Sequence, residues 1–363
     1  LFIGAPSSMT PGNDIGGADA ISANTITNWG SNTAQSGNAV FFGTSGTLSG
    51  ITAFNQTGLN VSWNSLSNAV GINAGAAGLR GILTDFTCTP AGTITNTISN
   101  NSVSLNCSSV TGLFEAISSS NTVVSAAIAG VTISINNNAI SSVLTGTNSD
   151  VTVTGIRNDF PSGVLNITGN SLKGNTSTAT TGGFTGILNT AAVSNAININ
   201  NNQFGDGSTN AVTFSAANSG TILAVSNTGA GAAAVLSINS NTFTRFVHGV
   251  PGSGNHNYVI NTATPVTQNI NNNIFTGITI NSTGAISAIS SAVLAPNKLI
   301  SGNIFTSITG GTGDMEMIST TGGSTLAIVR NNNIGNNVAN SINGAGNLIG
   351  IYLLSGGAVT ADS

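Results

Sequence analysis

The sequence is very poor in charge. Six Lys and Arg residues and ten Asp and Glu residues make up 4% of the 363 residues, whereas charged residues form about 25% of a typical soluble protein. Six cations cannot build the basic surface that a nucleic-acid backbone requires. We therefore exclude nucleic acid as a partner, and we expect no cofactor and no metal site because the chain has so few ionisable groups.

Strong helix formers and long apolar runs are also scarce. Gly, Asn, Ser and Thr, which favour helices weakly, take the place of Glu, Lys, Arg and Gln. This composition excludes a helix-rich fold, and without an apolar run of about 18 residues we expect no transmembrane segment. Disorder is excluded as well, because 39% of the residues are hydrophobic and the mean hydropathy is +0.27.

Cysteine, Trp and Tyr are rare. Cys88 and Cys107 are the only cysteines, and their spacing fits no zinc-binding pattern. Two buried thiols are favoured over a disulfide, which remains the alternative. The four Trp and Tyr residues are scattered along the chain, so they predict no platform for stacking sugar rings: Trp29, Trp63, Tyr258 and Tyr352.

What the sequence does contain is a repeat. An aliphatic residue, two further residues, Asn, one more residue and then Ile, Leu, Val or Phe recur along the chain, as in residues 135–140. Successive copies are 29 to 40 residues apart, about 34 on average, which is a period typical of solenoids. The ten asparagines of the repeat are Asn24, Asn64, Asn101, Asn138, Asn170, Asn202, Asn241, Asn273, Asn303 and Asn332.

The residues around this Asn alternate as in a β-strand. The third residue before Asn is apolar in every copy, the second is polar, and the fifth is often apolar, as at Ile133 and Leu165. This period of two predicts a strand that ends at Asn. We expect Asn to form the corner because it tolerates the left-handed conformation. Its side chain can then bond to the Asn of each adjacent coil, at roughly 0.5–1.5 kcal/mol per bond.

A glycine followed by an apolar residue marks another strand in many intervals. Examples are Gly50-Ile51, Gly81-Ile82, Gly112-Leu113, Gly155-Ile156, Gly186-Ile187, Gly249-Val250 and Gly350-Ile351. Three strands per interval, all with one direction, describe a parallel β-helix with loops between its strands, and residues 247–265 are the clearest loop. An antiparallel barrel or sandwich is the alternative, but the hairpin dipeptides Asn-Gly and Asp-Gly occur once each.

The predicted fold is therefore all-β: a single right-handed parallel β-helix, or β-solenoid, of about ten coils with an Asn ladder at one corner. Residues 1–20 form a lead-in or a preceding coil, residues 21–347 form the repeats, and residues 348–363 form the last strands of a chain that continues in a parent protein. We expect further coils or another subunit to cover the open end. Four phenylalanines are predicted to stack inside: Phe204, Phe243, Phe275 and Phe305.

At these repeats the chain resembles right-handed parallel β-helix proteins. Segments such as INNNIFTGIT (270–279), INSNTF (238–243) and ISGNIF (300–305) are similar to the tandem repeats of very large surface proteins of gliding bacteria, which export them by the type IX system. The resemblance covers residues 21–334. It implies an extracellular, cell-surface adhesin or filament stalk, although the C-terminal sorting domain of that family is not found in this sequence.

Enzymes that cleave polysaccharides also use β-helices, and they need clustered carboxylates. The best candidate set is Asp85, Glu115 and Asp159. Asp85 and Asp159 follow similar Gly-Ile motifs two coils apart, roughly 10 Å at the strand spacing, and Glu115 lies in the coil between them, one position out of register. Such a set would suit an inverting hydrolase or a calcium site, but isolated, solvated carboxylates are the favoured interpretation.

Two further sets are weaker candidates. Asp314 and Glu316 would share one strand face, and His248 and His256 lie in the expected loop with Tyr258. Solvated carboxylates and ordinary loop histidines are favoured over metal ligands in both cases, because neither set has enough partners nearby.

We therefore predict a structural protein and not an enzyme: a stiff cell-surface stalk or filament segment whose loops contact a surface or a glycan. A polysaccharide lyase or hydrolase that uses Asp85, Glu115 and Asp159 is the second interpretation. A phage or virus fibre is the third, and it would be an obligate trimer in solution.

Overall fold

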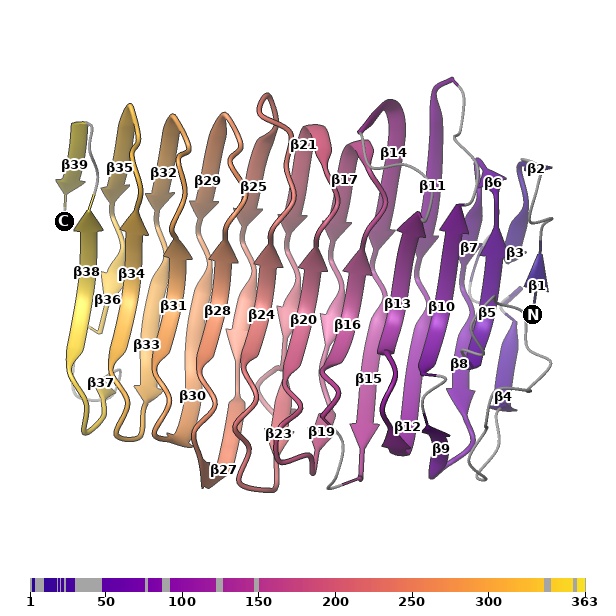
Figure 1. Cartoon of the computed structure of the whole chain (residues 1–363), viewed down its shortest axis with the longest axis horizontal. Helices are drawn as coiled ribbons and strands as arrows, with labels where there is room; N and C mark the ends of the chain where they lie inside the picture. Colours follow the sequence, from indigo (N-terminus) through magenta and orange to yellow (C-terminus); the bar gives the residue numbers. More distant parts are fainter. Residues whose placement is uncertain are drawn as a thin grey trace.

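The computed structural model describes residues 2–3, 10–17, 19, 21–22, 24–29, 48–75, 78–86, 92–121, 127–146, 150–335, 341–354 and 358–362. These residues form 39 β-strands and no helix. The strands of adjacent coils pair in parallel and stack into one long solenoid, with β1 near one end and β38 and β39 at the other (Figure 1). The all-β parallel β-helix predicted from the repeat is confirmed.

Three long sheets form the walls of the solenoid. The first sheet has eleven strands in the order β1 (Phe2–Ile3), β5 (Leu48–Phe54), β10 (Leu79–Phe86), β13 (Phe114–Asn121), β16 (Val153–Asn158), β20 (Phe184–Asn189), β24 (Ile222–Asn227), β28 (His256–Asn261), β31 (Ile286–Ser291), β34 (Met315–Thr321) and β38 (Leu348–Leu354). The second sheet has eleven in the order β3 (Asp14–Gly16), β7 (Asn60–Ser62), β11 (Ile94–Ser99), β14 (Ile128–Asn136), β17 (Ser162–Thr168), β21 (Val193–Asn200), β25 (Val235–Asn239), β29 (Thr267–Asn271), β32 (Asn297–Ser301), β35 (Leu326–Arg330) and β39 (Ala358–Asp362).

The third sheet has fifteen strands, because several coils cross it in two pieces. They are β4 (Thr25–Trp29), β8 (Ser65–Asn68), β9 (Ile72–Gly75), β12 (Ser102–Val110), β15 (Ala139–Leu144), β18 (Ser171–Leu172), β19 (Asn175–Ser177), β22 (Gln203–Phe204), β23 (Val212–Phe214), β26 (Thr242–Thr244), β27 (Phe246–Gly252), β30 (Ile274–Ser282), β33 (Ile304–Thr309), β36 (Asn333–Ile334) and β37 (Ile342–Asn343). A separate pair joins β2 (Thr10–Pro11) to β6 (Gln56–Thr57).

Each coil visits the three sheets in the same order. In one coil, β10 leads to β11, then to the corner residue Asn101 and to β12, before the chain enters β13 of the next coil. Equivalent apolar residues therefore pair across coils, as Ile98 does with Ile135, and Ile167 with Ile199. These columns of buried aliphatic side chains form the core that a single coil cannot close alone.

The ten asparagines of the repeat form one continuous ladder between the second and third sheets. Each Nδ2 donates to the Oδ1 of the Asn in the next coil at 2.9–3.1 Å, so that nine bonds join Asn24 to Asn332. The ladder therefore spans nine full turns. The Asn ladder predicted at one corner is confirmed.

An amide inside the ladder has all its hydrogen-bonding groups occupied. For Asn202, Nδ2 donates to Asn241 Oδ1 and to the carbonyl of Ile167, while Oδ1 accepts from both Nδ2 and the backbone N–H of Asn170. The residue is 1% exposed. Because a buried polar group must find partners inside the protein, only a side chain with two donors and an acceptor of this shape fits every rung.

The left-handed residue lies one position before the ladder Asn, so the prediction that Asn itself takes this conformation was wrong. The preceding residue makes the bend and, as at Asn137 and Asn201, keeps its own side chain at the surface. This turns the next side chain, the ladder amide, inward. The preceding residue has φ between 54° and 67° at nine corners: Trp63, Asn100, Asn137, Gly169, Asn201, Ser240, Asn272, Gly302 and Asn331.

The glycines of the first sheet face the interior where the third sheet comes close. A Cβ on Gly81 would overlap with the side chain of Val103, and one on Gly186 would overlap with Phe204. Val103 and Phe204 each lie two residues after a ladder Asn. The two sequence motifs thus supply the two partners of one contact across the core. One partner is the glycine of the Gly-apolar motif, and the other is the apolar residue two positions after the ladder Asn.

The rings of the four phenylalanines that follow the corner form a column inside the solenoid. The ring centroids of Phe204 and Phe243 are 4.9 Å apart, those of Phe243 and Phe275 are 4.6 Å apart, and those of Phe275 and Phe305 are 4.8 Å apart. The rings are stacked within 14° of parallel, and each residue is fully buried. The phenylalanine rings thus repeat once per coil inside the core, as the ladder asparagines do at the corner.

Residues 247–265 are not the single loop that the sequence predicted. They supply most of β27 and all of β28, and His248, His256 and Tyr258 are buried. Every second residue of a strand points to the same face, so Phe246 and His248, like His256 and Tyr258, point inward together. Gly249 accordingly lies in the third sheet and not in the first.

The last coil leaves apolar strands uncovered. Leu348 and Ile351 of β38 are 51% and 41% exposed, whereas their register partners Met315 and Ile318 in β34 are 1% and 0% exposed. Both β38 and β39 pair with one neighbouring strand only among the described residues. The contrast shows how much of the burial inside each coil comes from the coil stacked on it.

Replacing Asn202 with Leu should weaken the whole stack. The substitution removes the acceptor of the backbone N–H of Asn170 and the side-chain donor to the carbonyl of Ile167. At about 1–3 kcal/mol for each buried group, the free energy of unfolding should fall by about 3 kcal/mol. Urea unfolding followed by circular dichroism measures this change. The matched control is Asn195→Ala on the exposed surface of β21, which should change stability by less than about 0.5 kcal/mol; equal stability of both variants contradicts the role of the ladder.

Candidate functional site

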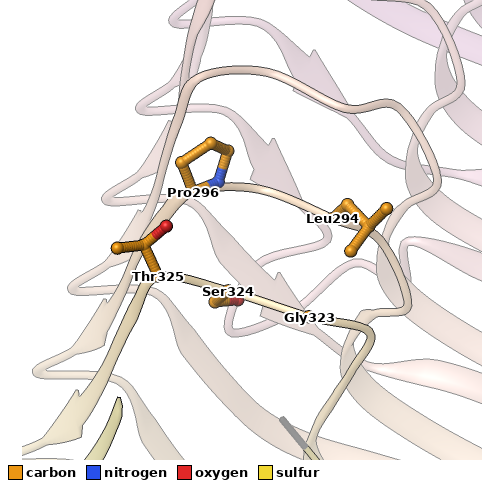
Figure 2. A pocket seen from close by; sticks show the side chains of 5 residues that line it. All are labelled: Leu294, Pro296, Gly323, Ser324 and Thr325. Carbon is orange, nitrogen blue, oxygen red and sulfur yellow. The ribbon is translucent and has the colours of Figure 1, made fainter. Parts of the chain in front are cut away.

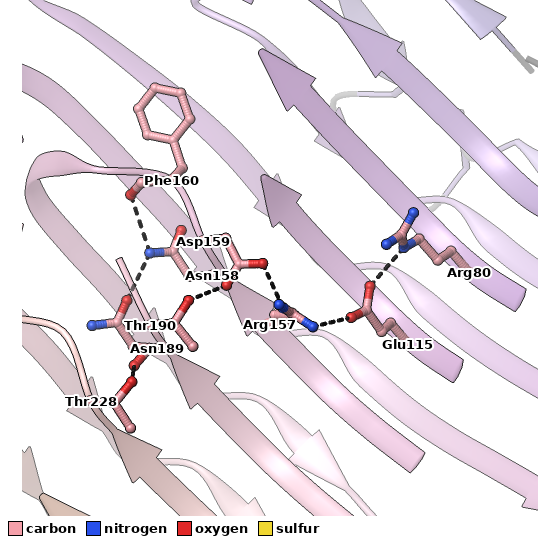
Figure 3. Close-up of polar contacts among 9 residues, drawn as sticks. All are labelled: Arg80, Glu115, Arg157, Asn158, Asp159, Phe160, Asn189, Thr190 and Thr228. Carbon is pink, nitrogen blue, oxygen red and sulfur yellow. Dashed lines mark hydrogen bonds and ion pairs between the residues drawn. The ribbon is translucent and has the colours of Figure 1, made fainter. Parts of the chain in front are cut away.

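Four charged side chains form a line of ion pairs across the first sheet (Figure 3). Glu115 in β13 binds Nε of Arg80 in β10 at 2.6 Å and Nη1 of Arg157 in β16 at 3.1 Å, and Arg157 Nε binds Asp159 at 2.5 Å. The hydroxyl of Thr190, in the next coil, also donates to Asp159. This network links four successive coils in a chain that has few charges to use.

Glu115 is the centre of the network. Its side chain is 1% exposed, and each of its oxygens binds a different guanidinium. Burial lowers the pKa of Arg157, but the charges of Glu115 and Asp159 outweigh this and raise its pKa above the ordinary value. Arg157 therefore stays charged, and Glu115 links the coils of β10, β13 and β16.

The structure does not bring Glu115 and Asp85 together. Glu115 pairs in register with Arg80, five residues before Asp85 on β10, which is about 16 Å along an extended strand. The prediction that Glu115 lies one position out of register was therefore wrong. The register of the two strands is set by the pairing of Ile82 with Ile117, and the motif Gly112-Leu113 lies before β13.

Asp85 and Asp159 do lie at equivalent positions of their coils. Asp85 pairs with Ser120, and Asn158, which precedes Asp159, pairs with Ser119. With β13 between them, the two aspartates are about 10 Å apart at the usual strand spacing. Asp159 is held by Arg157 and Thr190 (Figure 3). Because Arg157 also binds Glu115, Glu115 and Asp159 share one guanidinium, whereas Asp85 lies about 10 Å from Asp159.

Two hollows in the described surface contain none of these carboxylates. One of about 350 Å³ lies between two loops and has no ionisable lining (Figure 2): Leu294, Pro296, Gly323, Ser324 and Thr325. The other, of about 300 Å³, lies over the third sheet: Ser102, Ala139, Ile140, Ser141, Ser171, Lys173 and Thr209. Its one charge, Lys173, binds Asp206 at 2.8 Å and lowers the pKa of that carboxyl.

The remaining candidates are also separate from one another. Asp314 Oδ1 accepts from the backbone N–H and from Nδ2 of Asn347 in the next coil, and Glu316 lies on β34. The described residues contain no group of three or more His, Cys, Asp or Glu side chains that could hold a metal ion. Cys107 is buried and its thiol donates to the carbonyl of Ile72; Cys88 lies outside the described residues.

A polar cluster that the sequence placed in a loop lies inside the solenoid instead. Nδ1 of His248 is 3.4 Å from Nε2 of His256, and both rings pack among Phe214 and Tyr258. Burial, and to a smaller extent His248, lowers the pKa of His256 to about 3, and burial raises the pKa of Tyr258. The pKa of His248 is also lowered by burial. Both histidines are therefore neutral in the folded protein at pH 7.

A second amide ladder runs along the corner between the first and second sheets, and the sequence prediction missed it. Asn158, Asn189, Asn227 and Asn261 are joined by Nδ2-to-Oδ1 bonds of 2.8–2.9 Å, and Asn261 donates to Gln268. All five residues are buried. The signal was present, because each of the four asparagines ends a first-sheet strand, two residues after an inward Ile or Val.

Lys298 occupies the corner where this ladder ends. It is 2% exposed, pairs in register with Gln268, and donates to the carbonyls of Ser291 and Thr321 and to the hydroxyl of Thr320. Burial lowers its pKa to about 8. Ser291 and Thr320 occupy the positions that hold the ladder Asn in the preceding coils. There the flexible amine of Lys298, which has several donors, takes the place of the side-chain amide.

Part of the outer face of the second sheet, between β11 and β29, is uncharged and polar. From β11 to β29, the two outward columns next to the Asn ladder consist only of Asn, Ser and Thr. One column is Thr97, Ser134, Asn166, Asn198, Ser237 and Asn269; the other is Ser99, Asn136, Thr168, Asn200, Asn239 and Asn271. We call these twelve residues the amide face.

Comparisons with known proteins add no relative: no family model, no curated protein and no solved structure matches the chain. None of the described segments forms a helix with the length and hydropathy of a membrane span. The class defined by the structure is thus a parallel β-solenoid with two internal amide ladders, one line of ion pairs and one uncharged polar face.

Replacing Glu115 with Gln should destabilise the protein, since Arg80 would lose the counter-charge of Glu115 and Arg157 would keep that of Asp159 alone. Removal of one partner from a buried ion pair costs about 3–5 kcal/mol, and because both arginines are partly exposed we expect about 2 kcal/mol. The matched control is Glu316→Gln, in the same outward column of the first sheet, which should be nearly neutral. Urea unfolding of both variants measures this change. An unchanged midpoint for Glu115→Gln would show that the ion-pair network does not stabilise the fold.

The buried histidines predict a loss of stability in acid. His256 has a pKa of about 3 when folded and about 6.5 when unfolded. Between these values only the unfolded state binds the proton, so this contribution is complete above pH 6.5 and falls as the pH drops toward 3. At about 1.4 kcal/mol per pH unit, His256 lowers the free energy of unfolding by about 2 kcal/mol at pH 5 relative to pH 7.5. Urea midpoints at both pH values measure this, and His256→Phe should show a smaller difference than the parent protein.

Proposed function

We propose that the chain is a non-catalytic structural segment of an extracellular stalk or filament at a cell surface, with side faces that contact a surface or a glycan. The observation that carries this proposal is the unbroken amide ladder from Asn24 to Asn332. Nine side-chain bonds reinforce the parallel backbone pairing of every coil, and they do so without charge. Such a stack is stiff along its axis and depends little on salt.

The repeats support the proposed location. Their similarity to the tandem repeats of very large surface proteins of gliding bacteria suggests export by the type IX system and a role in adhesion. A surface with 4% charged residues suits a rod whose contacts rest on hydrogen bonds and apolar packing. The interior supplies rigidity, and the loops and outer sheet faces remain for contact.

The geometry around the carboxylates also favours a role without catalysis. Glu115 is buried between two arginines, Asp159 is held by Arg157, and neither hollow contains a carboxylate. A lyase or hydrolase requires two carboxyl groups that face one substrate. Glu115 and Asp159 instead bind one shared guanidinium, that of Arg157, and Asp85 lines neither of the two hollows.

We further propose that another solenoid layer, from the same polypeptide or from another subunit, covers β38 and β39. The exposed side chains of Leu348 and Ile351 occupy positions that are buried in the preceding coil. An uncovered strand edge with apolar side chains favours pairing with a further strand. A parallel coil continues both the sheet and the apolar columns.

Incubation with a panel of soluble plant, algal and bacterial polysaccharides tests the non-catalytic proposal. We expect no new reducing ends and no unsaturated sugar products from the parent protein, and the same result from the triple variant Asp85→Asn, Glu115→Gln, Asp159→Asn. Antibody labelling of intact producing cells should find the protein at the surface. Product release that the triple variant abolishes would overturn the structural role and establish the enzyme.

A further inference from the structure

We propose that the amide face of the second sheet binds extended chains of a neutral, hydroxyl-rich polysaccharide. This inference rests on the proposed structural and adhesive function and names the class of ligand and the face that holds it.

The amide face carries oriented donors. Oδ1 of Asn200 accepts the backbone N–H of Asn239 at 2.8 Å, and Oδ1 of Asn239 accepts that of Asn271 at 2.9 Å. The oxygen of each amide is thus fixed against the next coil. The Nδ2 groups of these three residues make no hydrogen bond to the described residues and lie at the half-exposed surface. They form a row of N–H donors whose direction is set before any ligand arrives.

Fixed donors favour binding, because little side-chain freedom remains to be lost. Adjacent coils place equivalent side chains about 4.8 Å apart, so a polymer that lies along the solenoid axis meets the donors of Asn200, Asn239 and Asn271 in three successive coils. Each contact is weak alone, but linked contacts reinforce one another. A small molecule would reach only one or two coils, which favours a polymer as the ligand.

The charge of the face selects a neutral polymer. None of its twelve residues is ionisable, and the charged line formed by Arg80, Glu115, Arg157 and Asp159 lies on the first sheet. Nothing on the amide face would attract an anionic chain. Hydroxyl and ring oxygens accept hydrogen bonds from amide N–H groups, and sugar hydroxyls donate to the Ser and Thr oxygens of the same columns.

The amide face ends before the last coils, so its uncharged polar composition is not simply that of the chain as a whole. In the column of Asn198 and Asn269, the next two coils carry Leu299 and Ile328. In the column of Asn200 and Asn271, Arg330 follows Ser301. On the side toward the ladder, exposed corner residues such as Asn137, Asn201 and Asn272 continue the polar surface.

The test is retention of the folded protein on insoluble polysaccharides. The probes are microcrystalline cellulose, chitin and curdlan, with immobilised polygalacturonate as the anionic comparison. The double variant Asn198→Leu, Asn269→Leu places on the amide face the residue type that Leu299 provides in the same column. The control variant Thr276→Val, Thr306→Val changes two outward threonines of the third sheet that bond to each other. Thermal unfolding of all three proteins verifies that the fold is kept.

We expect the parent and the control variant to be retained on at least one neutral polysaccharide, with affinity reduced about tenfold or more in the double variant. If the double variant fails to fold, Asn200→Ser, Asn239→Ser removes two donors with residues that already occur in that column. Equal retention of parent and amide-face variants, no retention on any neutral probe, or retention on polygalacturonate alone would each overturn the inference. In those cases the stalk function still stands unless the cleavage assay detects products.

Discussion

The hydrogen bond between the side-chain amides of successive coils is the interaction on which the rest of this structure depends. It fixes the position of each coil relative to the next at a single corner, and every other column follows from that register. Ile stacks on Ile and Phe on Phe because the amides beside them are aligned. This interaction suits a chain with few charges, because one side-chain amide bonds to another and no second residue type is needed.

Local signals in the sequence were sufficient to predict the architecture, but not every detail of the corner. The apolar residue three before Asn identified the second sheet, and the one two after it identified the third. The left-handed φ was assigned to the wrong residue because Asn is common at both positions, as in Asn137-Asn138. Only the three-dimensional structure distinguishes the residue that bends the chain from the residue that bonds across coils.

The candidate sites were less predictable, because they depend on register between coils. Asp85 and Asp159 were placed correctly at equivalent positions, since each follows a Gly-Ile pair in a first-sheet strand. Glu115 was misplaced because Gly112-Leu113 imitates that pair but lies in the connection before β13. His248 and His256 were assigned to a loop because the Gly, Pro and Asn residues around them obscure the alternation of the two strands. Ion pairs such as Glu115 with Arg157, 42 residues apart, leave no local signal.

The ladder from Asn24 to Asn332 has a direction. In each of its nine amide-to-amide bonds, Nδ2 donates to Oδ1 of the next coil toward the C-terminus, so the side-chain amide dipoles add up instead of cancelling. The ladder therefore has a net dipole of its own, with partial positive charge at the end near Asn332 and partial negative charge at the end near Asn24. Two such rods that lie side by side attract when they run in opposite senses, and rods that meet end to end attract head to tail.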